Sequence, residues 1–135
     1  MKYSNILFLK QHKYLSIIKY LDEEVTIYSL KSEINKIAKS YFFSINEYFK
    51  HVRKETGLKN KIPIYFSNNL LLFKLGSKEE NYYINFFKVM KICYEIDSVI
   101  IFFINNEKIE IKIERRILNN ELSKIQKVLH HLRNL

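Results

Sequence analysis

Most of the chain consists of short apolar, strand-like segments between polar turns, and strict alternation of apolar and charged residues, the two-residue period of a β-strand, marks 107–114. The helical period appears in two stretches, 31–57 and 116–133. Three short strands are predicted near the N-terminus, at 3–9, 14–21 and 24–30, with polar residues between them. β-Branched side chains such as Ile17 and Val25 favour extended backbone in these segments. We therefore expect the chain to begin with a strand region.

Helical signals replace the strand pattern between residues 31 and 57. A short helix comes first, with Ser32 as its predicted cap and Ile34, Ile37 and Ala38 as its apolar positions. A second helix is predicted to begin after Ser44, because Ser44 and Glu47 have the spacing of a capping box. Its apolar stripe consists of Ile45, Tyr48, Phe49 and Val52. Gly57 then provides a C-terminal stop.

Three further strands are predicted after the second helix, at 62–66, 70–75 and 82–92. A short polar loop at 67–69 joins the first two. Pro63 has no backbone N–H to give to a sheet, so it suits the start or the edge of a strand.

The clearest strand pair covers residues 98–114, where an apolar run meets Asn105-Asn106 and is followed by strict alternation of apolar and charged residues. Asn tolerates the positive φ of tight hairpin turns, so a two-residue turn is predicted. The cross-strand pairs in this register are Ile100–Ile111 and Phe102–Ile109 on one face, and Val99–Lys112 and Ile101–Glu110 on the other. The second face would be only half covered by apolar side chains.

The chain ends in a predicted helix over 116–133. Its narrow apolar seam consists of Leu118, Leu122, Ile125, Leu129 and Leu132. We expect this seam to pack on the sheet, and a helix–helix dimer contact is the alternative. The predicted fold class is α+β: an antiparallel β core with a basic middle helix and a C-terminal amphipathic helix, in a single domain over 1–135.

Composition limits the function classes. The longest apolar run near the N-terminus, at 6–9, is too short for a signal peptide, and no window approaches a membrane span, so we expect a cytoplasmic protein with no membrane partner. Cys93 is the single cysteine, which excludes a disulfide within one chain. The four histidines lack metal-ligand spacing, and no nucleophile elbow or nucleotide loop is present. We expect no enzyme activity, metal or cofactor.

The charge of the chain points to a polyanionic partner. The formal net charge is +9, and the basic residues are segregated, with eight Lys or Arg against three acids in 31–61 and seven acids against four bases in 79–114. A codon bias toward Lys in an A+T-rich genome is an alternative explanation for the excess.

The densest basic patch lies on the second predicted helix and on the loop after it. It consists of Lys50, His51, Arg53, Lys54, Lys59 and Lys61. These are the predicted DNA-binding residues, because Lys and Arg neutralise backbone phosphates and release counterions. The alternative is an ordinary solvated helix face.

A set of short motifs lies in one order between about residues 4 and 130. The motifs are Ser40, Phe43, Asn46 and Tyr48; Lys61-Ile62-Pro63-Ile64; Phe73 and Ser77; Glu80-Asn81-Tyr82-Tyr83-Ile84-Asn85; Phe103-Ile104-Asn105-Asn106-Glu107; the alternating Ile109, Ile111 and Ile113; and Leu118. Together they resemble the competence transcription factor (ComK-like) family of low-G+C Gram-positive bacteria. The sequence departs from that family at Tyr41 (usually Cys) and Tyr83 (usually Trp), and it ends before the family's longer C-terminal tail, which puts full activation and tail-dependent proteolytic control in question.

The resemblance implies a DNA-binding activator of DNA-uptake genes. Such a protein acts as dimers that pair on A+T-rich boxes and engage the minor groove, where a narrow A+T-rich groove attracts Lys and Arg. The implied partners are double-stranded A+T-rich DNA, further copies of the chain in a homodimer or higher homo-oligomer, and RNA polymerase.

Two other hypotheses remain open. Residues 37–57 resemble the second helix-turn-helix of AraC-type regulators, on Ile37-Ala38, Phe43-Ser44, Tyr48-Phe49 and Lys54-Glu55-Thr56-Gly57. That resemblance would also make 44–54 a DNA-facing helix. A non-catalytic, β-rich protein-interaction module is the alternative from another class, with a binding groove beside the half-covered hairpin face.

Overall fold

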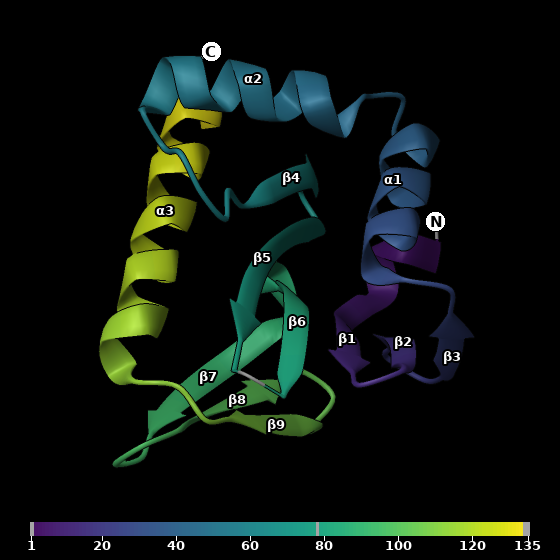
Figure 1. Cartoon of the computed structure of the whole chain (residues 1–135), viewed down its shortest axis with the longest axis vertical. Helices are drawn as coiled ribbons and strands as arrows, with labels where there is room; N and C mark the ends of the chain where they lie inside the picture. Colours follow the sequence, from purple (N-terminus) through teal and green to yellow (C-terminus); the bar gives the residue numbers. More distant parts are fainter. Residues whose placement is uncertain (1, 78, 134–135) are drawn as a thin grey trace.

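The computed structural model of the chain describes residues 2–77 and 79–133, and its architecture is α+β, as the sequence predicted (Figure 1). The helices are η1 (Lys2–Asn5, 3-10), α1 (Leu30–Ser40), α2 (Ile45–Thr56), η2 (Phe86–Lys88, 3-10) and α3 (Arg115–Arg133). The strands are β1 (Ile6–His12), β2 (Leu15–Tyr20), β3 (Glu24–Ile27), β4 (Ile64–Ser67), β5 (Leu70–Gly76), β6 (Glu80–Asn85), β7 (Val89–Tyr94), β8 (Val99–Phe103) and β9 (Lys108–Ile111).

The strands form two antiparallel sheets. The larger has six strands in the order β3-β2-β1-β6-β5-β4, and the smaller has three in the order β7-β8-β9. Helices α1 and α2 lie on one side of the large sheet, and α3 runs beside it toward the small sheet (Figure 1). Among the described residues, no helix is both long and apolar enough to cross a bilayer.

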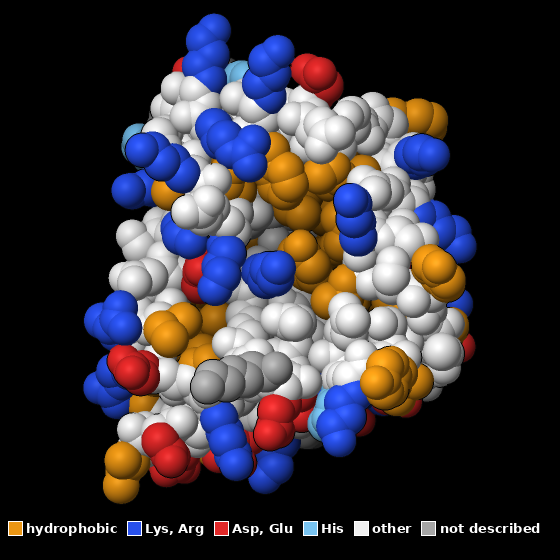
Figure 2. Space-filling model, in the orientation of Figure 1, with side chains coloured by type: hydrophobic (Ala, Val, Ile, Leu, Met, Phe, Trp, Pro, Cys, Tyr) orange, Lys and Arg blue, Asp and Glu red, His pale blue; other side chains and the backbone are white. Residues whose placement is uncertain are grey.

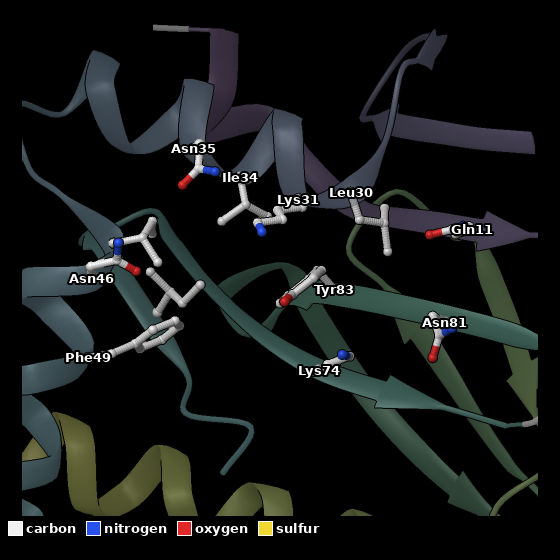
Figure 3. A pocket seen from close by; sticks show the side chains of 12 residues that line it. Gln11, Leu30, Lys31, Ile34, Asn35, Asn46, Phe49, Lys74, Asn81 and Tyr83 are labelled. Atoms are coloured by element: carbon white, nitrogen blue, oxygen red, sulfur yellow. The ribbon is translucent and has the colours of Figure 1, made fainter. Parts of the chain in front are cut away.

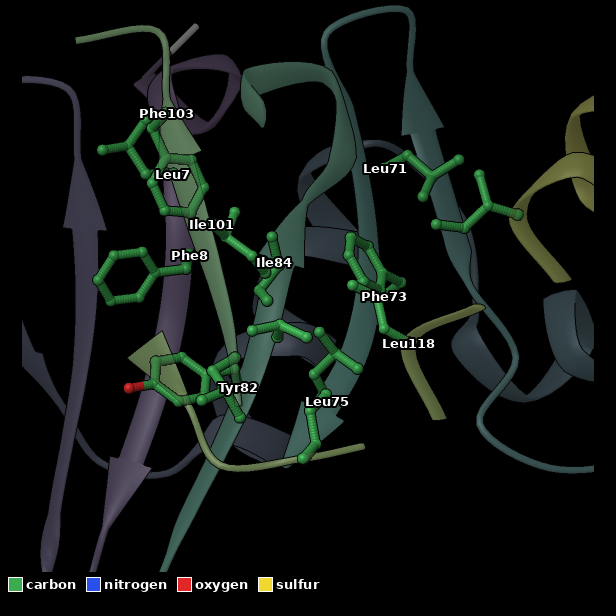
Figure 4. Close-up of a cluster of buried hydrophobic side chains, with 14 residues drawn as sticks. Leu7, Phe8, Leu71, Phe73, Leu75, Tyr82, Ile84, Ile101, Phe103 and Leu118 are labelled. Carbon is green, nitrogen blue, oxygen red and sulfur yellow. The ribbon is translucent and has the colours of Figure 1, made fainter. Parts of the chain in front are cut away.

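Period-2 alternation in β5 separates two hydrophobic cores. Leu71, Phe73 and Leu75 point to the core shared with the small sheet and α3 (Figure 4). Leu70 and Leu72 point to the opposite core, which α1 and α2 cover. Alternate side chains of a strand lie on opposite faces, so this apolar run is buried on both sides. Lys74, the next residue on the helix-facing side, interrupts the run.

The N-terminal strands differ from the prediction at their ends. Residues 2–5 form η1, and β1 extends to His12, because Lys10, Gln11 and His12 pair with Tyr82, Asn81 and Glu80 of β6. Ser29, three residues before the predicted cap, accepts the hydrogen bond from Ser32 N (3.1 Å) and starts α1. The predicted strand at 24–30 therefore stops at Ile27.

The segment predicted as one strand at 82–92 is two strands in different sheets. The chain leaves the large sheet at Asn85, passes through η2 and enters the small sheet at Val89. Asn85 is fully buried, and its side chain accepts from Leu71 N and Phe87 N (both 3.2 Å). It also donates to Ile6 O (2.8 Å) and Asn69 O (3.0 Å). Because an amide both donates and accepts, the Asn85 side chain satisfies backbone N–H and C=O groups that strand pairing leaves free at this break.

The hairpin register predicted for 98–114 is wrong by one residue. Phe103 N donates to Glu107 O (2.8 Å) and Asn106 has φ 71°, so the loop has three residues rather than two. The observed pairs are Val99–Ile111, Ile100–Glu110, Ile101–Ile109 and Phe102–Lys108. A one-residue shift moves side chains to the other face, so apolar pairs now share the core face. The half-covered face is therefore made of other residues than predicted: Ile100 and Phe102 lie opposite Glu110 and Lys108 on the outer face.

Helix α3 packs inward, as predicted, but its contact stripe is wider than the predicted seam. Its buried residues are Leu118, Glu121, Ile125 and Val128. Leu122 and Leu129 pack against the core of the small sheet, while Val128 joins Val52, Leu58 and Ile62 in a third cluster between α2 and α3. The helix thereby connects the small sheet with α2 and the loop that follows it.

The predicted start and end of α2 are confirmed. Ser44 Oγ accepts from Glu47 N (3.4 Å), and Gly57 caps the C-terminus with φ 78° while donating to Arg53 O (3.0 Å). A Cβ at Gly57 would meet no atom within 4 Å, so only the backbone conformation opposes a side chain.

Replacing Gly57 with Ala is expected to lower the free energy of unfolding by about 1 kcal/mol, because left-handed backbone disfavours a Cβ. Urea denaturation followed by circular dichroism measures the change. Glu55→Ala, on the exposed face of the same helix, is the control and should change stability by less than about 0.5 kcal/mol. Equal stability of the two variants would contradict the role of Gly57.

Candidate functional site

A cavity of about 490 Å³ opens between α1, α2 and the large sheet (Figure 3). Its lining residues are Gln11, Leu30, Lys31, Ile34, Asn35, Ile45, Asn46, Phe49, Ile64, Lys74, Asn81 and Tyr83. Its size lies in the range of small-molecule and cofactor pockets. Its lining combines apolar side chains with four amides and two ammonium groups.

Strand pairing sets the floor of this cavity. Lys74 of β5 lies opposite Tyr83 of β6, and Tyr83 lies opposite Leu9 of β1. Gln11 and Asn81 form the next pair on the same face. These polar side chains therefore lie on the same face of the sheet as the buried Leu9 and Leu72. They begin where the helices no longer cover that face.

The cavity continues into two neighbouring depressions. One, of about 210 Å³, shares Phe49, Lys74 and Tyr83 with it and adds Arg53, Lys59, Asn60, Lys61 and Ile62. The other, of about 560 Å³, shares Asn35, Ile45 and Asn46 and adds Ala38, Lys39, Phe42, Phe43 and Ser44. We call the three together the α2 groove, because they follow the length of α2.

The α2 groove is strongly cationic. Its charged lining residues are Lys31, Lys39, Arg53, Lys59, Lys61 and Lys74, and no described residue of its lining is Asp or Glu. Figure 2 shows Lys and Arg side chains around an apolar hollow, with most of the visible Asp and Glu side chains below it. Since like charges are gathered without acidic partners, the groove attracts anions.

Unpaired amides and a phenol add hydrogen-bonding capacity. In the described part of the chain, no hydrogen bond is made by the side chains of Asn35, Asn46 or Asn81. Burial raises the pKa of Tyr83, so its hydroxyl stays protonated at neutral pH and can donate. These groups are open to water and available to a ligand.

A partly buried tyrosine fixes α2 against the sheet. The Tyr48 hydroxyl donates to Pro63 O (2.7 Å) and accepts from Tyr65 N (3.1 Å). Burial raises the pKa of Tyr48 to about 12, so the hydroxyl remains a donor at neutral pH. The adjacent Phe49 ring then faces the groove, and the Arg53 guanidinium lies 5.5 Å from its centroid.

The loop that carries Lys59 and Lys61 is held from two sides. Arg53 Nε donates to Lys59 O (3.3 Å), and Lys124 Nζ of α3 donates to Asn60 O (3.0 Å). Lys124 also pairs with Glu121, at 3.0 Å, a carboxylate with a side-chain exposure of only 5%. The ion pair fixes Lys124, so the loop position depends on α3.

The six predicted site residues separate into two groups. Arg53, Lys59 and Lys61 line the α2 groove together. Lys50, Lys54 and His51 are exposed on α2 but are outside its lining. His51 points toward α3, where its Nε2 lies 3.1 Å from His131 Nε2.

The sequence prediction did not include Lys31, Lys39 and Lys74, which also line the α2 groove. Lys74 carried a signal, because it interrupts an apolar strand on the face of Leu70 and Leu72. Lys31 and Lys39 lie on α1, 22 and 14 residues before Arg53 in the sequence (53 − 31 and 53 − 39). Only the packing of α1 and α2 on the same core of the large sheet brings them to the same groove.

Among the described residues, no group of three or more His, Cys, Asp or Glu side chains could hold a metal ion. Comparison of the chain with protein-family models, with curated proteins and with solved structures gives no match. The groove itself is therefore the basis for assigning a function.

Proposed function

We propose that this protein binds double-stranded DNA through the α2 groove and regulates transcription. The observation that carries the proposal is the lining of the groove, where six Lys or Arg side chains gather without an acidic residue among its described members. Backbone phosphates are the polyanion that such a row neutralises, with release of counterions.

A preference for A+T-rich DNA follows from the same side chains. A narrow A+T-rich minor groove has enhanced negative potential and attracts inserted Arg and Lys. Arg53 suits this role, because its exposed guanidinium is restrained by Lys59 O and the Phe49 ring. The free amides of Asn35 and Asn46 supply donors and acceptors for base edges.

The regulated genes, the oligomer and the polymerase contact rest on the sequence resemblance. The ComK-like motifs support control of DNA-uptake genes by a cytoplasmic protein that acts as a homodimer or higher homo-oligomer and contacts RNA polymerase. One groove per chain suits such an assembly, because two copies would present two cationic surfaces to adjacent A+T-rich boxes.

A second docking mode is favoured by the connection between α1 and α2. Only residues 41–44 separate the two helices, which is the turn length of helix-turn-helix motifs. In that mode the outer face of α2, with Lys50 and Lys54, would enter the major groove.

Exposed apolar side chains near the small sheet, Met90, Ile96 and Ile104, are the observation in favour of a protein-interaction module.

Fluorescence anisotropy with labelled A+T-rich and G+C-rich duplexes tests the proposal at several salt concentrations. We expect tighter binding to the A+T-rich duplex and a linear fall of log K with log salt, since each phosphate contact contributes about 0.9 to the slope. Absence of binding to either duplex at low salt would overturn it. Nuclease-resistant capture of a protein partner, without duplex binding, would favour the interaction module.

A further inference from the structure

The turn between α1 and α2 holds a phenylalanine in a backbone conformation that favours glycine. Phe42 directly follows Tyr41, the C-cap of α1, and has φ 64°. Phe42 N donates to Lys39 O (3.0 Å), and Phe43 N donates to Ala38 O (3.1 Å). This is the Schellman arrangement of a helix end, in which the left-handed residue is usually Gly because a Cβ is disfavoured there.

The fold makes no use of the Phe42 ring. The residue is 95% exposed, and none of the hydrophobic clusters or ring pairs of the described residues includes it. Its neighbours behave differently: the Tyr41 and Phe43 rings pack on Phe66, at 5.6 and 5.3 Å between centroids. Left-handed backbone and an exposed aromatic ring both oppose stability, which is the combination expected where function retains a residue.

Phe42 lies at one end of the α2 groove. It lines the same depression as Lys39, Ser44 and Asn46, and that depression runs into the cavity that leads to Arg53. DNA held along the cationic lining would therefore pass the exposed ring. No carboxylate in the described lining would repel it there.

We propose that Phe42 is a wedge that inserts between two base pairs of double-stranded DNA, from the minor groove, while the groove cations hold the phosphates. The proposal rests on the DNA binding proposed above. Minor-groove proteins kink DNA with apolar wedges of this kind, and the TA steps of A+T-rich DNA unstack easily. A neutral or basic protein partner for the ring would gain nothing from the cationic lining beside it.

The test compares wild type with Phe42→Gly on an A+T-rich duplex of about 25 base pairs that carries a dye at each end and 2-aminopurine at a central TA step. Wild type is expected to raise energy transfer between the ends, because the duplex kinks, and to brighten 2-aminopurine, because its step unstacks. Phe42→Gly is expected to lose both signals and to bind about tenfold more weakly. Its salt slope should not change, because no charge is removed.

The free Phe42→Gly protein is expected to unfold at a higher temperature than wild type, since glycine relieves the left-handed backbone. A variant that is more stable than wild type but kinks and binds DNA less well cannot owe its loss of DNA binding to a damaged fold. Phe42→Leu, which keeps an apolar side chain, should retain most of the kink. Tyr14→Gly, which removes an equally exposed ring from the β1–β2 turn, should leave the kink unchanged.

Equal kinking by wild type and Phe42→Gly, with duplex binding intact, overturns the wedge and leaves the DNA interface standing. Loss of self-association by free Phe42→Gly without loss of kinking also overturns it, because the ring would then serve a contact between copies. Absence of duplex binding by wild type overturns both proposals.

Discussion

Replacing Arg53, Lys59 and Lys61 together with Ala is expected to abolish most of the affinity for DNA. These three residues line the same end of the α2 groove. In the proposed complex, each replacement therefore removes one phosphate contact, which is worth about 0.9 in the slope of log K against log salt. The slope should become shallower by up to about 2.7, and the affinity at 0.1 M salt should fall on the order of 10²-fold. Anisotropy titrations at several salt concentrations measure both quantities.

The matched control removes the same charge from the other end of the molecule. Lys108, Lys112 and Arg116 are exposed at β9, just after it and at the start of α3, outside the groove lining. Their triple Ala variant should change the slope by less than about 0.9, because it lowers the net charge without removing a contact. Equal losses in the two triple variants would show that net charge, and not the groove, attracts DNA.

A Lys50→Ala, Lys54→Ala double variant separates the two docking modes. Both residues are exposed on α2 but lie outside the groove, so binding in the groove predicts a slope close to that of wild type. A slope shallower by about 1.8, with the groove triple variant unaffected, would place the outer face of α2 on the DNA instead.

Asn85→Leu is expected to have the largest effect on stability. The substitution removes four hydrogen bonds from a fully buried position and leaves Leu71 N, Phe87 N and two carbonyl groups without that partner. Each unsatisfied buried group costs about 1–3 kcal/mol, so the free energy of unfolding should fall by about 4 kcal/mol or more. Thermal denaturation should show a midpoint about 15 °C lower.

Asn81→Leu is the matched control, since it makes the same change on β6 at an exposed position. Its stability should stay within about 0.5 kcal/mol of wild type. A loss of less than about 1 kcal/mol in Asn85→Leu would contradict the role of Asn85 in joining the two sheets. Asn85 would then be a tolerated buried polar residue and would not join the large sheet to the small one.

The elements that local sequence encodes were predicted well. The capping box at Ser44, the stop at Gly57 and the apolar stripe of α2 all agree with the structure, because caps and helical periodicity depend on residues a few positions apart. The strand of β5 and the final helix α3 were predicted to within about one residue for the same reason. An antiparallel α+β fold followed from these elements.

The errors share one physical cause, which is that distant residues decided the outcome. Strand β1 extends through a polar segment because β6 pairs with it. The break after Asn85 depends on carbonyls at Ile6 and Asn69 that the local pattern does not reveal. The observed hairpin register differs from the predicted one because the loop has three residues, with Asn106 in left-handed backbone. This loop puts Ile109 and Ile111 on the core side.

The sequence by itself determined the fold class, the boundaries of α2 and the presence of a basic segment, because each is written in neighbouring residues. Tertiary structure alone decided which cations line the same groove. It placed Lys31, Lys39 and Lys74 beside Arg53, Lys59 and Lys61, and it left Lys50, His51 and Lys54 outside. A shared groove requires α1, α2 and β5 to meet, and that meeting depends on packing of the buried faces of the helices, which local charge does not report.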